Sequence, residues 1–167
     1  MFELETKRLR LIPLTPYQLE LLIEDIDKLE KELSVKYDGV EIEGHMLEAT
    51  REQFLVCLTD TENYPWHTFW QFVLKDENKI IGSACFKGMP DLEGCVEIGY
   101  GINQNYENMG LTKEAAKEMC TWAFLSGKVK YITAQTEKDN IPTRKILEYC
   151  GLKIVQETED AYFWKSE

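Results

Sequence analysis

The sequence predicts one mixed α/β domain over residues 1–167, with one central sheet and helices on its faces. The length of 167 residues suits a single domain, since domains hold roughly 100–200 residues. Hydrophobic residues make up 44% of the chain, which is typical of a globular protein. Segments with strand-like and helix-like spacing of apolar residues follow in the order β-α-α-β-β-β-α-β-α-β-β.

The N-terminal part is predicted to hold one strand and two helices. Apolar residues alternate over residues 8–14 (RLRLIPL), which predicts the first strand. Thr15 and Pro16 are typical of a helix start, and the apolar residues from Leu19 to Leu33 recur at helical spacing. We therefore expect one amphipathic helix there, and a second helix around residues 47–58.

The remaining chain is predicted to hold six strands and two helices. The strands are expected at Phe69–Leu74, Lys79–Phe86, 93–103, 129–136, 152–156 and 161–165. The helices are expected at residues 109–126, with Gly127 as the C-terminal cap, and at residues 140–150, with Asn140 as the N-cap.

The charge balance excludes some classes of partner. Nineteen Lys and Arg residues stand against 30 Asp and Glu residues, which gives a formal net charge of −11. Such a chain is a poor binder of nucleic acid or of an anionic membrane surface, because both need basic side chains. A cationic substrate and a merely solvated acidic surface both remain open.

The cysteines favour a structural role in a reducing compartment. The chain has five (Cys57, Cys85, Cys95, Cys120 and Cys150), an odd number without a C-x-x-C pair. We therefore expect neither a disulfide framework nor a metal site. No apolar run approaches the roughly 20 residues of a membrane span, and the charged N-terminus does not resemble a signal peptide. A cytoplasmic location is expected.

The segment VEIGYGI, residues 96–102, holds the first candidate site residues. Because side chains alternate along a strand, Glu97, Gly99 and Gly101 share one face. That face has one carboxylate and two positions without a side chain. Glycines inside a strand mark either the approach of a ligand or close packing under another backbone, and both readings remain open.

The loop after this strand predicts an anion site. Residues 103–112 (NQNYENMGLT) lead directly into the start of a helix. The first backbone N–H groups of a helix lack internal partners, and the helix dipole favours negative charge there. The loop contains neither the phosphate-loop pattern G-x-x-x-x-G-K nor the dinucleotide pattern G-x-G-x-x-G.

These segments resemble the GNAT N-acetyltransferase superfamily, and most of all its ribosomal-protein-alanine N-acetyltransferase branch. The similar segments are ETKRLRLIPLTP near the N-terminus, VEIGYGI with the following loop and helix, and DNIPTRKILEYCGL at residues 139–152. The resemblance implies a mostly antiparallel sheet of about seven strands that is splayed in the middle. It also implies acetyl-CoA as co-substrate and a small-molecule or peptide amine as acceptor. Members of the family often form homodimers, but no segment here identifies an interface.

The resemblance also implies roles for individual residues. Glu97 is the expected catalytic base. The expected coenzyme-binding residues are Tyr100, Gly101, Ile102, Glu107, Asn108, Met109, Gly110, Leu111, Thr112, Asn140, Thr143 and Lys145. The loop departs from the family pattern, because Glu107, Asn108 and Met109 replace an Arg or Gln, a Gly and a Lys. Lys113 is the candidate to compensate for the lost cation. Asn140 has a second reading as a plain N-cap, and Glu97 a second reading as a surface carboxylate.

Two roles stay without a firm candidate. Many members of the family place a general-acid Tyr where this chain has Leu147, and Tyr149 faces another side of the helix. An aromatic rim could bind a cationic acceptor, although packing is the alternative for each of its residues. The rim candidates are Tyr37, His45, Tyr64, Trp66 and His67. Besides an N-acetyltransferase, a non-catalytic acyl-CoA-binding or regulatory domain and an unrelated α/β fold remain open.

Overall fold

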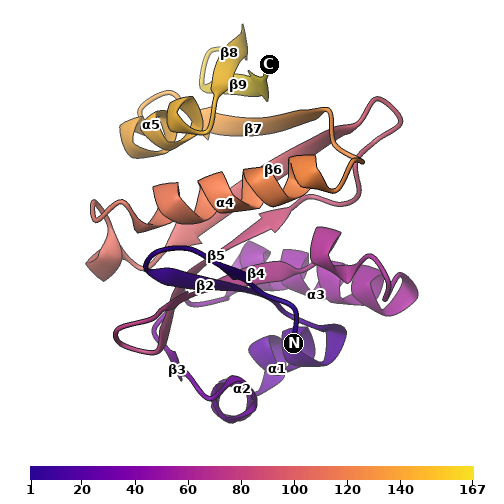
Figure 1. Cartoon of the computed structure of the whole chain (residues 1–167), viewed down its shortest axis with the longest axis vertical. Coiled ribbons are helices and arrows are strands. Elements are labelled where there is room, and N and C mark those ends of the chain that lie inside the picture. The colour runs from indigo at the N-terminus through magenta and orange to yellow at the C-terminus, as the bar shows by residue number, and fades with distance from the viewer.

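A central sheet runs through the protein, and helices lie on both of its faces (Figure 1). The structure is a computed structural model that describes all 167 residues. Its helices are α1 (Pro16–Glu24), α2 (Ile26–Leu33), α3 (Gly44–Thr59), α4 (Leu111–Leu125) and α5 (Ile141–Tyr149). Its strands are β1 (Leu4–Glu5), β2 (Leu9–Pro13), β3 (Lys36–Tyr37), β4 (Phe69–Leu74), β5 (Lys79–Phe86), β6 (Cys95–Ile102), β7 (Tyr131–Glu137), β8 (Leu152–Glu157) and β9 (Ala161–Ser166).

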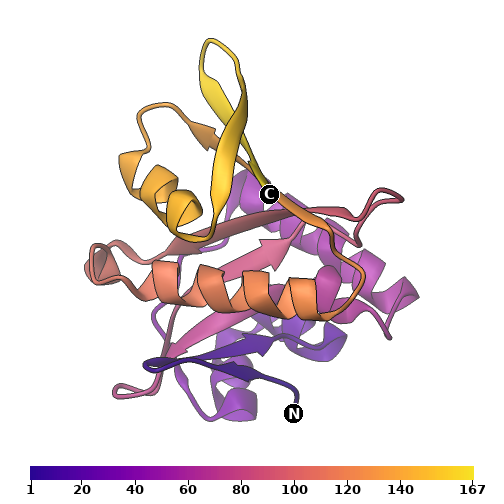
Figure 2. The same ribbon diagram turned by 45° about the horizontal axis from the view of Figure 1, so that its top comes forward.

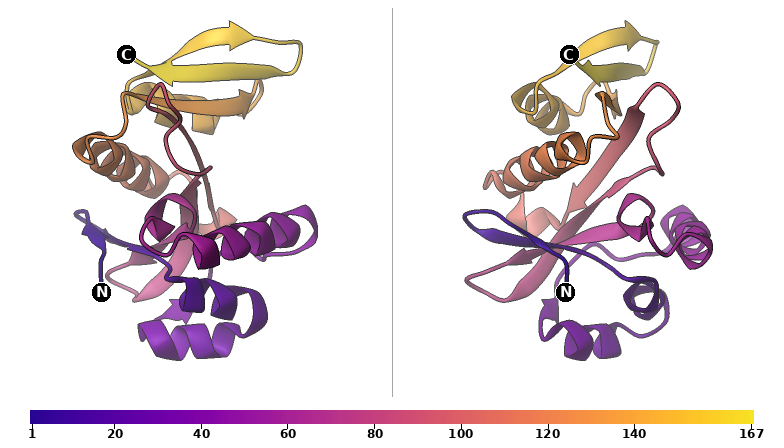
Figure 3. Two further views of the ribbon diagram at one scale, coloured as in Figure 1. Left: turned by 90° about the vertical axis from the view of Figure 1, so that its right-hand side faces the viewer. Right: turned by 45° about the vertical axis from the view of Figure 1, so that its right-hand side comes forward.

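The strands form the order β1-β2-β4-β5-β6-β7-β9-β8, and β3 pairs with the start of β5. The pairs β6–β7 and β3–β5 are parallel, and all the others are antiparallel. Helices α4 and α5 lie on one face, and α1, α2 and α3 lie on the other (Figure 3). The β8–β9 hairpin forms the C-terminal end of the sheet (Figure 2). The predicted class and all seven predicted strands are confirmed, and the two additional strands, β1 and β3, hold only two residues each.

The expected first helix is two helices, which corrects the prediction. Thr15 caps α1 together with Gln18 in a capping box, as the start signal predicts. The helix then ends at Asp25, whose φ of −156° and ψ of 82° are not helical. Its carboxylate accepts a hydrogen bond from the Lys28 backbone N–H at 3.0 Å and so caps α2. Helical spacing continues across the break because both helices bury leucines against the same side of the sheet.

Helix α4 packs against the sheet in the larger of the two apolar clusters of the protein. Its buried stripe, which includes Ala115, Met119 and Ala123, lies against β6 residues Val96 and Ile98. Gly127 follows α4 with a φ of +72°, the left-handed conformation expected of a C-terminal cap glycine. Burial of one large apolar side chain stabilises a fold by about 1.5–3 kcal/mol, so this interface holds the strand and the helix rigidly together.

Strands β6 and β7 separate in the middle of the sheet. They pair only from Cys95–Tyr131 to Glu97–Thr133, although both strands continue beyond these residues. From Ile98 to Ile102, β6 pairs with β5 alone. Figure 1 shows the two strands diverging toward the end of the sheet where α4 begins. The expected splay is therefore present, which removes the support for an unrelated fold.

None of the five helices is both long and apolar enough to cross a bilayer.

Candidate active site

The glycine face of β6 holds the candidate base. Glu97 is half-buried and forms an ion pair with Lys87, which lies across from it just after β5. Gly99 follows on the same face, and a Cβ atom there would lie 3.9 Å from Lys87 Cε. The carboxylate and the ammonium therefore lie together beside the part of β6 that has no side chains.

The backbone of β6 directs polar groups into the splay. Lys87 N–H donates to the Glu97 carbonyl at 2.9 Å, and Asn103 N–H donates to the Ile81 carbonyl at 2.8 Å, so the odd-numbered residues face β5. Because bonding directions alternate along a strand, the N–H and C=O groups of Tyr100 and Ile102 face the other way. No ladder with β7 reaches them. They are thus available to an extended ligand, whereas Gly101 directs its backbone toward β5.

The Tyr100 side chain connects the two sides of the splay. Its hydroxyl donates to the Thr143 carbonyl on α5 at 3.4 Å. Burial raises the pKa of Tyr100 above its usual range, so the phenol stays protonated at neutral pH. Among the expected site residues, Tyr100 and Thr143 are a pair that the structure brings into contact.

The start of α4 has free backbone donors. Gly110 precedes the helix with a φ of +76°, and no side chain caps the helix. The first N–H group with a helical partner is that of Glu114, which donates to the Gly110 carbonyl at 3.1 Å. The N–H groups of Leu111, Thr112 and Lys113 therefore remain unpaired, and the positive end of the helix dipole lies there.

Cations from two distant segments surround this helix start. A depression of about 490 Å³ next to Gly110 is lined by four cations and two carboxylates: Lys7, Arg8, Lys113, Lys117, Glu114 and Glu118. Arg8 donates to the Met109 carbonyl at 2.9 Å and pairs with Glu114 at 2.8 Å, so it also neutralises an acidic residue of the helix. Lys113 Nζ lies 3.9 Å from the centre of the Tyr149 ring. Arg8 and Lys113 thus place near the helix start the positive charge that the loop lacks at Met109.

The other loop residues have different surroundings. Glu107 is exposed and lines a separate depression with Asp38 and Glu41, away from the basic one. Met109 is 53% exposed, while Leu111 and Thr112 are buried at the start of α4. Asn108 has a φ of +60°, the left-handed conformation for which the family uses glycine.

Helix α5 begins as its sequence predicts. Asn140 Oδ1 accepts a hydrogen bond from the Thr143 N–H at 3.2 Å, so Asn140 is an N-cap, and its amide N–H₂ group donates no hydrogen bond. Lys145 is exposed. Leu147 is 1% exposed within the core, and Tyr149 is 51% exposed next to Lys113. Tyr149 thus faces away from the sheet, as the helical geometry predicts.

A cavity of about 210 Å³ opens on the glycine face of the sheet. Gly99 and Gly101 line it from β6, and Gln71, Ser83 and Cys85 line it from β4 and β5. Tyr37, Val40, Ile42, Met46 and Phe69 supply most of its apolar surface. The cavity lies on the side of the sheet opposite α4, so a ligand there could approach the splay from the other face.

The structure places one of the five aromatic-rim candidates at the cavity. Only Tyr37 lines the cavity. Trp66 is 4% exposed and packs on Phe86 and Trp122 in the core, with ring centroids 5.1 and 4.6 Å away. Tyr64 packs against the α1–α2 cluster. His67 lies 3.2 Å from Asp60, and His45 is exposed at the start of α3. Trp66 and Tyr64 thus follow the packing alternative, while His45 and His67 simply lie outside the lining of the cavity.

The cysteines behave largely as expected. All five are free; Cys57, Cys120 and Cys150 are buried, and Cys85 and Cys95 are half-buried. Burial raises the pKa of the Cys85 thiol, against smaller opposing effects of the Gln53 amide and the Lys87 charge. A neutral thiol is a weak nucleophile, so Cys85 is a lining residue of the cavity.

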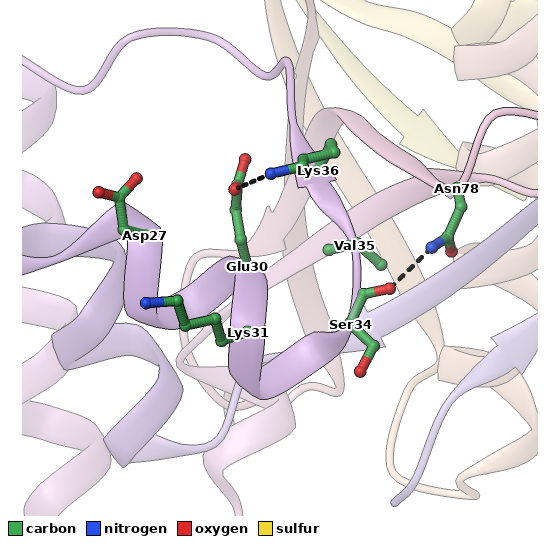
Figure 4. Close-up of a pocket in the computed structure, with 7 residues that line it drawn as sticks. All are labelled: Asp27, Glu30, Lys31, Ser34, Val35, Lys36 and Asn78. Carbon is green, nitrogen blue, oxygen red and sulfur yellow. Dashed lines mark hydrogen bonds and ion pairs between the residues drawn. The ribbon is translucent and has the colours of Figure 1, made fainter.

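Another depression, of about 420 Å³, lies between α2 and β3 (Figure 4). Its polar groups bond to one another: Lys36 donates to Glu30 at 2.9 Å, and Asn78 donates to the Ser34 carbonyl at 2.7 Å. The first bond ties β3 to α2, and the second ties the link between α2 and β3 to the β4–β5 turn. The polar groups of this depression therefore hold neighbouring elements together.

Sequence reasoning missed Arg8, Lys87 and the polar residues of the cavity. One of them had a signal: Gln71 is the single polar residue of an otherwise apolar strand, FWQFVL. A buried amide in such a strand needs a partner, which marks a polar site. Arg8 and Lys87 join the site through contacts between distant segments, which no local pattern reveals.

Comparisons with known proteins agree with this geometry. A family model described as an acetyltransferase (GNAT) domain matches residues 8–153. The chain is 30% identical to a Bacillus subtilis protein named uncharacterized N-acetyltransferase YjdG. The alignment spans 164 residues, which are 98% of this chain and 97% of that protein. The chain therefore belongs to the GNAT family of N-acetyltransferases.

Solved structures confirm the fold and include the branch expected from the sequence. A ribosomal-protein-S5-alanine acetyltransferase from Vibrio fischeri has a TM-score of 0.72 and 16% identity, over 99% of this chain and 96% of that one. The microcin C7 self immunity acetyltransferase MccE, solved in complex with acetyl-CoA and AMP, has a TM-score of 0.66 and 15% identity, over 96% of this chain and 93% of that one.

Proposed function

We propose that residues 1–167 form one domain that transfers the acetyl group of acetyl-CoA to a primary amine. The observation that supports this most is the splay between β6 and β7, with free N–H groups of α4 at its open end. A pyrophosphate suits those N–H groups and the basic residues around Gly110. The unpaired backbone groups of Tyr100 and Ile102 suit the amide-bearing arm of the coenzyme. The free cysteines support a reducing compartment such as the cytoplasm.

Glu97 is the proton acceptor in this proposal. An ammonium has no lone pair, so the acceptor must lose a proton before it attacks. Glu97 takes that proton, the amine nitrogen bonds to the thioester carbonyl carbon, and the carbon–sulfur bond breaks. The coenzyme thiolate, with a reference pKa of about 8.5, takes up the second proton of the amine by way of solvent. The products are the acetylated amine and CoA.

The ion pair with Lys87 supports a second candidate function. It engages the carboxylate that the reaction needs, and Leu147 leaves no tyrosine at the acid position of the family. A non-catalytic acyl-CoA-binding domain would keep the coenzyme site and need no base.

One experiment separates the two functions. Acetyl-CoA binding is measured by calorimetry, and acetyl transfer to a panel of amines by CoA release, for the unmodified protein and for Glu97→Gln. The proposal expects micromolar binding in both proteins and a 100-fold or greater loss of transfer in the variant, the scale of a lost general base. Binding without any transfer by the unmodified protein would favour the second function. Absence of binding would refute both.

A further inference from the structure

A buried amide without a partner faces the cavity on the glycine face. Gln71 lies on β4 and is only 2% exposed; its side chain forms no hydrogen bond within the protein, and its amide atoms are not fully enclosed but face the open space of the cavity. Most buried polar side chains are paired, because an unpaired one loses its hydration without compensation. An amide that is kept in this state, at the wall of a cavity, is positioned to bond a ligand.

A second unpaired oxygen lies nearby. Gln53 on α3 buries its Oε1 atom without a hydrogen-bond partner, and its side chain lies next to the Cys85 thiol, which lines the cavity. Ser83, directly across from Gln71 in the β4–β5 ladder, adds a hydroxyl to the same wall. The polar groups of this region are therefore neutral: two amides, the Ser83 hydroxyl, the Cys85 thiol and the Tyr37 hydroxyl, which donates to the Val40 carbonyl.

The remaining wall is apolar and uncharged. No Asp, Glu, Lys, Arg or His side chain lines the cavity, and Val40, Ile42, Met46 and Phe69 cover much of it. Its volume of about 210 Å³ lies below the roughly 300–1,000 Å³ of pockets for drug-sized ligands. The cavity therefore takes a small apolar group with one neutral polar function, and a second charge would enter it at the cost of its hydration.

The cavity and the candidate base lie on one face. Gly99 and Gly101 line the cavity, and Glu97 precedes them on the same side of β6. Gln71 lies beyond Ser83 from Gly101 in the ladder, so an acceptor whose body occupies the cavity against Gln71 directs its amine past Gly101 and Gly99 toward Glu97. This step rests on the proposed function.

We infer that the acceptor is a primary amine with a compact apolar body and a carbonyl or carboxamide group that pairs with the Gln71 amide. An amide group is self-complementary, since each partner offers one N–H donor and one C=O acceptor. Leucinamide has this chemistry, and so does the first residue of a peptide that begins with leucine. Spermidine and lysinamide do not, because each brings a further charge.

The test compares leucinamide with 3-methylbutylamine, which has the same apolar group without the amide. The kcat/KM ratio of the two amines is measured for the unmodified protein and for Gln71→Leu. The difference in basicity of the two amines cancels when the ratios are compared. We expect the preference for leucinamide to fall about tenfold in the variant, the scale of two neutral hydrogen bonds. A Leu-Gly-Gly peptide as a third acceptor shows whether the natural source is a chain end or a small molecule.

A matched control separates recognition from folding. Gln18 is also a buried glutamine, at 4% exposure, but its side chain is paired in the α1 capping box. Gln18→Leu is expected to lower the melting temperature and to leave the acceptor preference unchanged. Gln71→Leu is expected to keep the melting temperature, because the Gln71 side chain forms no hydrogen bond within the protein that the variant would lose.

Two outcomes overturn the inference: an unchanged preference for leucinamide in Gln71→Leu, or spermidine and lysinamide used as well as leucinamide. If no amine is acetylated at all, the proposed function fails, and binding decides the inference instead. Leucinamide in the presence of CoA should then still raise the melting temperature of the unmodified protein and not that of Gln71→Leu. Absence of that difference refutes the inference.

Discussion

The proposed phosphate site at the start of α4 makes a prediction in which stability and binding change in opposite directions. Gly110 has a φ of +76°, and a Cβ atom added there would meet only Arg8 Nη2, at 3.5 Å. Asp and Asn thus fit in space and share a strain of about 1 kcal/mol for the left-handed conformation. The pair Gly110→Asp and Gly110→Asn therefore isolates the effect of one negative charge.

The charge should stabilise the protein. A carboxylate near a helix N-terminus contributes about 0.3–1 kcal/mol, and Arg8 lies beside it. Gly110→Asp should therefore exceed Gly110→Asn in free energy of unfolding by about that amount. The same carboxylate should repel a pyrophosphate. Two unit charges 4 Å apart interact by up to about 4 kcal/mol near a protein surface, so even a screened fraction gives a tenfold difference, about 1.4 kcal/mol.

Calorimetric titration with acetyl-CoA and urea unfolding of the two variants measure both quantities. The Asp variant should be the more stable one and bind acetyl-CoA at least ten times more weakly than the Asn variant, and the gap in affinity should narrow at high salt. Equal affinity of the two variants would show that the phosphates do not lie at the start of α4. Reversed stability would show that the helix dipole and Arg8 do not act at this position.

Three further predictions concern neighbouring parts of the structure. Lys113→Ala should weaken acetyl-CoA binding several-fold and flatten its salt dependence. The control is Lys153→Ala, because Lys153 lies on the edge strand β8 and pairs with Glu167; this variant should change neither quantity. Equal acetyl-CoA affinities of the two variants in calorimetric titration would contradict this prediction. Gly82→Ala should lower the free energy of unfolding by about 1–3 kcal/mol, because its Cβ would lie 2.5 Å from a backbone carbonyl oxygen, whereas Gly101→Ala, with open space around it, should change it little in urea unfolding. Glu114→Gln should lose stability at neutral pH: burial raises the pKa of the carboxyl, but bonds from Thr6 and Arg8 outweigh it and hold the pKa below the usual 4.5. The carboxylate thus stabilises the fold above that value, and the difference in melting temperature between the variant and the unmodified protein should shrink as the pH falls below it; a constant difference would refute the assignment.

The sequence predicted features that depend on local chemistry. Thr15, Asn140 and Gly127 hold the caps expected of them, and the seven longer strands lie where alternation placed them. The break at Asp25 was missed because leucine spacing continues through it. Strand β3 was missed because two residues are too few for any pattern.

The candidate site was only partly predictable for a related reason. Glu97, Tyr100 and Gly110 follow from one continuous segment of sequence. Arg8 reaches the same helix start from the link between β1 and β2, and Lys87 reaches Glu97 from the position just after β5. Such contacts depend on strand order and register, which are long-range properties of the fold. The splay was expected only from the family resemblance, because the residue pattern of one strand does not predict where its pairing with a neighbouring strand ends.

The three-residue ladder between β6 and β7 also bears on cooperativity. Strands β7, β8 and β9 and helix α5 join the other half of the sheet through that ladder, the Tyr100–Thr143 hydrogen bond and packing against α4. Such a joint permits partial opening of the C-terminal unit at a lower free energy than global unfolding. A molecule bound across the gap would close this opening, so the amides of β7 and β9 should exchange with solvent more slowly when it is present. Residues 131–167 would then open and close as one unit, and the bound ligand would hold that unit closed.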